Sequence, residues 1–215
     1  QLLEWAIEEP ALFKHIIPIA TNAFHSPWAI AFNASQRYCI ESDTTWQHKN
    51  ETAGVEGMKV ARSIALLSYR NYYTYQHYQS EEDPKKLSGF KSESYQRYQG
   101  KKLADRFNAF SYYTLSKSMD AHNVGRERVS VKDALANIKA ATLVISISSD
   151  ILFPVSEQQF LADHIPGAKL VIIDSTYGHD GFLLEFEQIQ TAIEKFLSAD
   201  KKTKIDVKLG TIAGE

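Results

Sequence analysis

Asp150 and His179 have the residue types and the positions of an acid and base pair. Residues 141–150 read ATLVISISSD and residues 168–180 read AKLVIIDSTYGHD, so each side chain follows a run of apolar β-formers. The carboxyl ends of parallel strands meet at one edge of a sheet, which predicts that the two side chains lie within hydrogen-bond reach, about 2.6–3.2 Å. There the carboxylate can fix the tautomer of the imidazole and stabilise its protonated form, with His179 as a general base.

Each residue taken alone has a simpler interpretation. Asp150 can cap the helix that follows its strand, and a single histidine in a loop is usually a surface residue. The two together, each after a strand and in the order acid then histidine, favour catalysis. In hydrolases with a parallel sheet a serine precedes them in G-x-S-x-G, but no serine of this sequence has glycines at both positions.

Three apolar runs predict a parallel sheet connected by helices, typical of the α/β class. They are expected in the spatial order 15–20, 142–148, 169–173, with the first strand at an edge. Helices are predicted at 131–138, 156–164 and 181–198, between and after these strands. The first residues, Gln1–Glu9, have helical spacing without a capping residue. This sequence is therefore expected to start inside a helix, with part of the sheet absent.

Between the first two strands the pattern becomes helical for about a hundred residues. Ser26 before Pro27 predicts a helix start, and helical periodicity covers 28–41, 55–69 and 94–119, the last as more than one helix. We therefore divide the sequence into a core segment at 1–25, an all-helical insertion at 26–125, a core segment at 126–198 and a peripheral tail at 199–215.

Composition excludes several classes of function. The net charge of −2 argues against nucleic-acid or anionic-membrane binding, and no apolar run approaches the roughly 20 residues that span a bilayer. A single cysteine, Cys39, excludes an internal disulfide and fits a reducing compartment, so we expect a cytoplasmic protein. The seven histidines are scattered, which predicts no metal site.

Six collinear segments resemble one enzyme family. The strings LLEWAI, HIIPIATNAFHSPWAIAFN, VARSIALLSYR, RFNAFSYYTLSKSMDAHNVGR, SISSDILFP and YGHDGFLLE are similar to the C-terminal two-thirds of homoserine O-acetyltransferases. The resemblance covers roughly residues 1–198. It implies an α/β-hydrolase fold with an inserted helical lid that also forms a homodimer.

The resemblance also implies roles for individual residues. Asp150 and His179 would be the acid and base of a triad whose serine stands just before Gln1. Arg70 would bind the carboxylate of L-homoserine, Asp180 its ammonium group, and Asp120 would border the active-site tunnel. From the residues alone, the positive charge of Arg70 can instead stabilise the C-terminus of its helix, and Asp180 can cap the helix that follows it.

The implied activity is ping-pong acetyl transfer from acetyl-CoA, a co-substrate, to homoserine in methionine biosynthesis, with no bound cofactor. This sequence without its serine would be inactive alone and would need the missing N-terminal half as a partner. Two alternatives remain open: a related transferase that uses succinyl-CoA or serine, and a non-catalytic helical dimerisation or binding module on a degenerate hydrolase core.

Overall fold

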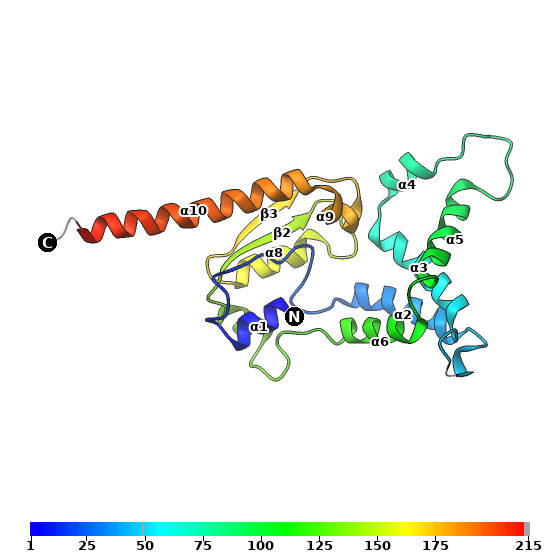
Figure 1. Cartoon of the computed structure of the whole chain (residues 1–215), viewed down its shortest axis with the longest axis horizontal. Helices are drawn as coiled ribbons and strands as arrows, with labels where there is room; N and C mark the ends of the chain where they lie inside the picture. Colours follow the sequence, from blue (N-terminus) through cyan, green and yellow to red (C-terminus); the bar gives the residue numbers. More distant parts are fainter. Residues whose placement is uncertain (49, 213–215) are drawn as a thin grey trace.

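The computed structural model describes residues 1–48 and 50–212, with side chains described up to residue 199. Figure 1 shows two parts: a small sheet flanked by helices, and a group of helices to one side of it. Within the described residues, no helix combines the length and the apolar character needed to cross a bilayer.

The sheet has three parallel strands in the predicted order. β1 (His15–Ile16), β2 (Ala141–Ile147) and β3 (Lys169–Ile173) pair with β2 in the middle, and Leu143 aligns with Lys169. The first strand is shorter than the predicted 15–20. Pro18 has no N–H to donate, and beyond it the pairing continues only as an isolated bridge between Ile19 and Ile145.

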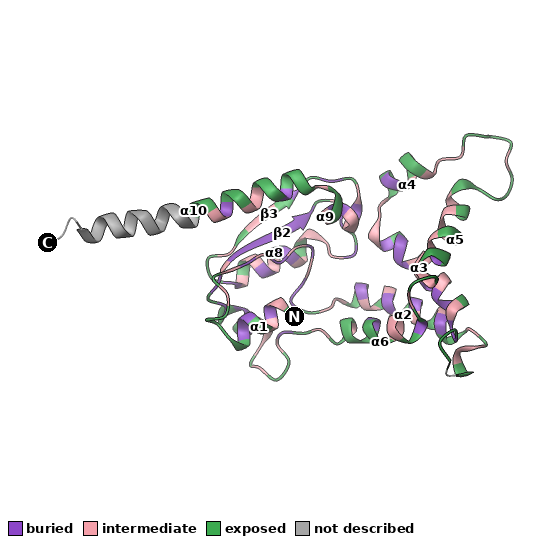
Figure 2. Cartoon of the chain, viewed as in Figure 1, coloured by how far each residue is buried: buried purple, intermediate pink, exposed green. Residues whose placement is uncertain are grey.

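Alternating side chains of β2 build a core on each face of the sheet. Val144 packs against α1 (Leu2–Glu8), α7 (Val131–Ala136) and α8 (Val155–His164). On the opposite face Leu143, Ile145 and Ile147 pack against α10 (Phe186–Ile212). Figure 2 shows β2 buried between these layers, as expected for a parallel strand covered on both sides.

The last predicted helix, 181–198, is in fact two helices. α9 (Gly181–Leu184) follows a 3₁₀ turn, η2 (Gly178–Asp180), and ends at Glu185, whose ψ of 44° is not helical. α10 then continues through Ile212, beyond the predicted boundary. The expected peripheral tail at 199–215 therefore begins as helix, and its side chains from residue 200 onward lie outside the described residues.

The helical insertion contains five α-helices and one short 3₁₀ helix in the described residues. These are α2 (Pro27–Glu41), η1 (Trp46–His48), α3 (Val55–Tyr69), α4 (Tyr72–Gln79), α5 (Lys91–Ala104) and α6 (Ala109–Asp120). The Ser26 hydroxyl caps α2, as predicted, at 3.3 Å from the Ala29 amide. The sequence periodicity predicts no helix at 72–79. The signal for α4 is its capping residue, Asn71, whose side chain accepts from the Thr74 amide.

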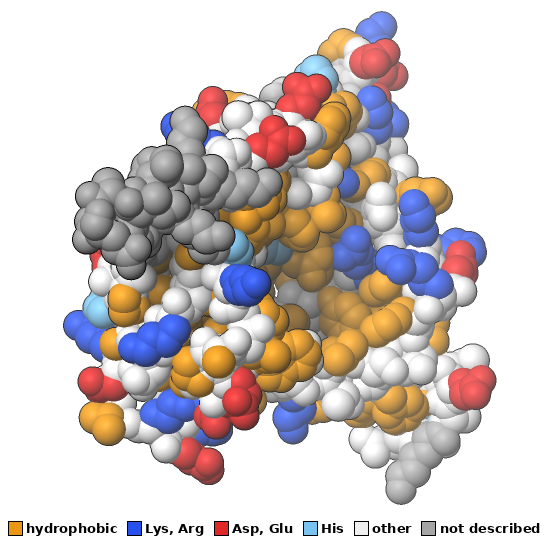
Figure 3. All heavy atoms as spheres, turned by 60° about the vertical axis from the view of Figure 1, so that its left-hand side comes forward, with side chains coloured by type: hydrophobic (Ala, Val, Ile, Leu, Met, Phe, Trp, Pro, Cys, Tyr) orange, Lys and Arg blue, Asp and Glu red, His pale blue; other side chains and the backbone are white. Residues whose placement is uncertain are grey.

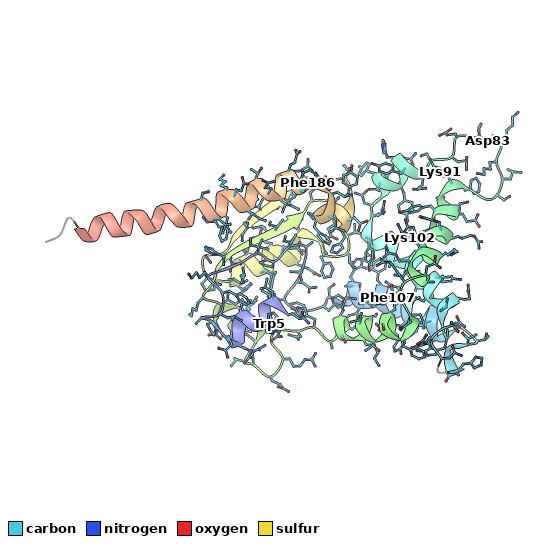
Figure 4. The ribbon with its side chains drawn as sticks, viewed as in Figure 1. Trp5, Asp83, Lys91, Lys102, Phe107 and Phe186 are labelled. Atoms are coloured by element: carbon cyan, nitrogen blue, oxygen red, sulfur yellow. The ribbon has the colours of Figure 1, made fainter. Side chains whose placement is uncertain are left out.

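The two ends of the insertion meet at its base. Phe24 and Asn123 form an antiparallel bridge, and the backbone hydrogen bonds His25 to His122 and Val124 to Ala23 are both 2.9 Å. The insertion therefore leaves the α/β part and returns to it at one place. Figure 4 shows the resulting layout, with Trp5 on α1 in the α/β part and Asp83 at the far end of the insertion.

Candidate active site

Asp150 and His179 contact each other as the sequence predicted. The Nδ1 atom of His179 lies 2.7 Å from Oδ2 of Asp150. A carboxylate only accepts hydrogen bonds, so Nδ1 carries the shared hydrogen and Nε2 is left as the acceptor. The other carboxylate oxygen, Oδ1, accepts from the amides of Leu152 and Phe153 at 2.8 and 2.9 Å. These bonds hold the fully buried carboxylate in place, while the histidine side chain keeps 17% exposure.

Backbone and serine contacts fix the loop that carries His179. The Ser149 hydroxyl, next to Asp150, accepts from the Gly178 amide at 2.9 Å, and the Ser148 hydroxyl accepts from the Ser175 amide at 3.0 Å. Gly178 has a φ of +68°, a conformation that other residues rarely adopt. The turns after β2 and β3 are thus tied directly to each other, as well as through the sheet.

Aromatic rings surround the histidine. Phe153 and Phe182 each lie with ring centroids 5.2 Å from the His179 ring, and Tyr69 at 6.0 Å. They line a cavity of about 300 Å³ together with His25, which directly precedes the insertion, and with residues of the insertion, among them Asn33, Gln36, Arg62 and Ser68. Sequence analysis missed these wall residues. Only Phe153 and Phe182 had a usable signal, since each lies three residues after a predicted site residue.

Arg70 and Asp180 lie next to this site and face each other. Nε of Arg70 is 3.3 Å from Oδ2 of Asp180, an ion-pair distance, yet the buried Nε–H is not oriented to donate a hydrogen bond. The guanidinium also lies 5.6 Å from the ring centroid of Tyr95. Burial raises the pKa of the Asp180 carboxyl, and the charge of Arg70 opposes that shift. Asp180 lines the cavity, whereas Arg70 does not.

The alternative role of Asp180 as a helix cap is not observed, because its side chain makes no capping hydrogen bond to α9. The helix there is a single turn, and the carboxylate instead turns toward Arg70 of the insertion. The interaction that Asp180 makes is therefore between the two parts of the molecule and not within its own helix.

Asp120 lies behind the cavity wall and not on it. Its carboxylate is 2.6 Å from Nη2 of Arg37 and accepts from Nδ2 of Asn33 at 2.8 Å. Asn33 in turn contacts Nε2 of His25 at 3.1 Å, and both of these residues line the cavity. Burial lowers the pKa of His25. The predicted tunnel residue thus supports the wall through its partners.

A larger hollow lies elsewhere. A groove of about 940 Å³ runs between β3 and α10, but none of the predicted site residues lines it. Figure 3 shows one face of the molecule, on which hydrophobic side chains gather around a hollow with basic side chains beside it. Among the described residues, no cluster of three or more histidine, cysteine or acidic side chains is arranged to hold a metal ion.

Comparison of the chain with known proteins finds similar enzymes. No family model matches the chain. A homoserine O-acetyltransferase of Cyclobacterium marinum is 46% identical over 90% of the chain, and the chain spans 55% of that relative.

Solved structures show the same fold. A homoserine O-acetyltransferase from Bacillus anthracis superposes with a TM-score of 0.81 at 18% identity, over 90% of this chain and 55% of that one. An acetyl esterase, MekB, superposes with a TM-score of 0.76 at 20% identity, over 91% of this chain and 58% of that one. The fold is therefore the predicted α/β-hydrolase fold. The chain, which spans about half the length of the curated relatives it matches, is homologous to homoserine O-acetyltransferases over that length.

Proposed function

We propose that this chain supplies the general base and the acceptor site of an enzyme that transfers the acetyl group of acetyl-CoA to the hydroxyl of L-homoserine. The observation that carries this proposal is the 2.7 Å contact between His179 and Asp150 beside a cavity, with Nε2 of the ring free to accept a proton. Homology supplies the substrates, because the relatives carry the name of this reaction.

In the first half-reaction a serine hydroxyl attacks the thioester carbon of acetyl-CoA. Nε2 of His179 takes the hydroxyl proton and returns it to the departing CoA thiolate, leaving an acetyl ester on the serine. Asp150 stabilises the imidazolium that exists between these two transfers. In the part of the chain that the structure describes, no hydroxyl is hydrogen-bonded to Nε2, so the serine would come from sequence outside these residues.

In the second half-reaction the homoserine hydroxyl gives its proton to Nε2 and attacks the acetyl ester. The bond between the acetyl carbon and the serine oxygen then breaks, and the serine takes the proton back from Nε2. The Arg70 guanidinium would bind the carboxylate of homoserine and Asp180 its ammonium group, since opposite charges favour these pairings. The rings of Tyr69, Phe153 and Phe182 would exclude water, which would otherwise hydrolyse the ester. We further propose a cytoplasmic homodimer that forms through the helical insertion.

The competing non-catalytic module has less support. A degenerate core has no need to keep a buried carboxylate with both oxygens engaged, one of them by a largely buried imidazole. The choice between acetyl-CoA and succinyl-CoA depends on residues around the acyl group, so both donors belong in the test.

The test joins this chain to the part of a relative that it does not span. The segment of the Cyclobacterium marinum enzyme that precedes the matching region is co-expressed with the 215-residue chain, and CoA release is followed with and without homoserine. Acetyl transfer to homoserine is expected from the pair. Replacement of Asp150 by Asn should lower turnover about 10⁴-fold, the effect of removing the orienting carboxylate in serine triads.

His179→Ala in the same complex should abolish both half-reactions. A wild-type rate for that variant would refute the assignment of the base. If transfer occurs only with succinyl-CoA, the proposed acyl donor is wrong and the proposed mechanism still holds.

A further inference from the structure

Helix α4 of the insertion contacts the loop that carries His179, although the two are far apart in sequence. The Thr74 hydroxyl lies 2.7 Å from the carbonyl oxygen of Thr176, three residues before the histidine. A hydroxyl has one hydrogen to donate, and the alternative acceptor, Oδ1 of Asn71, is farther away at 3.2 Å. Thr74 is almost fully buried, at 4% exposure, whereas Thr176 is exposed, so the donor side of this bond is shielded from water.

The same corner of the insertion also limits the loop sterically. A Cβ atom placed on Gly178 would lie 2.8 Å from the carbonyl carbon of Arg70 and 3.0 Å from the carbonyl oxygen of Tyr69. Only a residue without a side chain can pass there. The loop is thus held between the Ser149 hydroxyl on one side and the backbone at the end of α3 on the other.

A third contact extends the connection. The hydroxyls of Tyr78 on α4 and Tyr177 in the loop interact, which raises the pKa of Tyr177. Figure 1 shows α4 separated from the strands, so these contacts connect two parts of the molecule that otherwise fold around different cores.

We propose that the corner formed by the end of α3 and the start of α4, residues 69–74, sets the position of the His179 ring, with Thr74 as the positioning residue. The loop from 174 to 178 is short, and three of its residues are fixed by Ser148, Ser149 and Thr74. A shift of α4 away from the core must therefore release Thr176 and loosen the contact between Nδ1 and Asp150. Opening of the insertion would switch off the base, so that proton transfer requires the closed state. This consequence rests on the proposed function; the geometric coupling does not.

The experiment measures the His179–Asp150 hydrogen bond directly by proton NMR of the full 215-residue chain. The readout is the downfield resonance of the Nδ1 proton and its exchange rate with water. Thr74→Val removes the hydroxyl and nearly keeps the shape, and Thr74→Ser keeps a hydroxyl at this position. As a control, Thr191→Val removes a hydroxyl bond to the carbonyl of Glu187 inside α10, a bond that does not involve a loop residue.

We expect Thr74→Val to accelerate exchange of the Nδ1 proton about five- to tenfold, the factor that corresponds to one net hydrogen bond. In Thr74→Ser and Thr191→Val the exchange rate of the Nδ1 proton should stay within about twofold of the wild type, because neither change removes the hydrogen bond to Thr176. Unchanged exchange in a folded Thr74→Val chain overturns the proposal.

If Thr74→Val does not fold, Tyr78→Phe decides, because Tyr78 is 45% exposed and its hydroxyl is not part of a core. Faster exchange in that variant supports the coupling, and unchanged exchange overturns it. Neither measurement involves acetyl transfer. The two proposals can fail separately. If Thr74→Val accelerates exchange of the Nδ1 proton but the chain co-expressed with the missing segment transfers no acetyl group, this inference stands and the proposed function is refuted.

Discussion

The Arg70 guanidinium and the Asp180 carboxylate, the two groups expected to bind the charged ends of an amino acid, face each other across 3.3 Å. They come from the insertion and from the His179 turn, so each holds the other in the absence of a ligand. A zwitterionic substrate can replace both partners: its carboxylate takes the place of Asp180 at Arg70, and its ammonium group takes the place of Arg70 at Asp180. Their pairing therefore keeps two partly buried charges compensated before a substrate arrives.

Replacement of Arg70 by Lys should impair the acceptor step in the complemented enzyme. A lysine keeps the charge but loses the planar fork that grips a carboxylate with two hydrogen bonds. We expect the KM for homoserine to rise about tenfold or more, the equivalent of one charge-assisted hydrogen bond, with CoA release in the absence of homoserine unchanged. Arg97→Lys, in an exposed pair with Glu93, is the matched control. Equal loss in both half-reactions would assign Arg70 a general structural role.

Gly178→Ala should destabilise the chain far more than Gly167→Ala. Both glycines have a φ of +68°, but only Gly178 would place its new methyl group against backbone, whereas nothing lies within 4 Å of Gly167. The backbone conformation alone costs about 1–2 kcal/mol for an alanine. Overpacking against the end of α3 should add about 1–3 kcal/mol at Gly178, measured by urea unfolding. Equal losses would mean that the loop moves away freely.

Acid should weaken the fold through His25. Its side chain is 6% exposed, and burial holds its pKa below the ordinary value of 6.5 despite the nearby Asp120 carboxylate. Below pH 6.5 the unfolded chain binds a proton that the folded chain does not. Stability is therefore intact above that value and falls as the pH drops toward the lower folded pKa, by at most about 1.4 kcal/mol per unit.

The check compares unfolding free energies at about pH 7.5 and about pH 5.5, on either side of the ordinary histidine pKa. His25→Asn should flatten the difference, and His48→Gln, at an exposed position, should not. An undiminished pH effect in His25→Asn would assign the acid sensitivity to other groups.

The Arg37–Asp120 pair should couple α2 to α6 strongly. Both side chains are largely buried, at 13% and 16% exposure, so removal of one partner leaves a poorly solvated charge. We expect Arg37→Met to cost about 3 kcal/mol and a double-mutant cycle with Asp120→Asn to give a coupling of about 1–3 kcal/mol. The exposed Lys101–Asp105 pair should give less than about 1 kcal/mol. Similar couplings for the two pairs would contradict the role given to burial.

The insertion should form a homodimer in solution. Its helices expose large apolar and aromatic side chains, among them Val60, Leu67, Tyr72 and Tyr73, each more than half exposed. Sedimentation at about micromolar concentration should show a dimer, and Leu67→Asp with Tyr73→Asp should shift it to monomer by placing charge in the contact. Leu12→Asp, exposed outside the insertion, is the control. A monomeric wild type refutes the prediction.

The parts of this fold that could be predicted from sequence are those with a strong local period. β3 was expected at 169–173 and is found there, and α3 matches its predicted range 55–69, because apolar spacing and flanking turns mark both. The strand order and the Asp150–His179 contact followed from the geometry of parallel sheets. The shortening at Pro18 and the break at Glu185 depend on single residues within otherwise regular patterns, where local periodicity has little power.

The cavity walls could not be predicted in the same way. Asn33 and Tyr69 reach the site from different helices of the insertion and His25 from the segment before it, and only the packing of the insertion on the sheet brings them to His179. The pairing of Asp120 with Arg37 is likewise a contact between helices with no fixed spacing in sequence. Such contacts depend on tertiary packing, which a single sequence does not encode as a local pattern.

The bridge between Phe24 and Asn123 makes the insertion a side branch of the α/β scaffold. Because the two ends of the insertion are hydrogen-bonded to each other, the register of β1 against β2 does not depend on the length of the insertion between them. Evolution can therefore lengthen, shorten or exchange the branch without rebuilding the scaffold. The insertion can thus change how it excludes water and how it contacts a second subunit, while Asp150 and His179 stay in place on the scaffold.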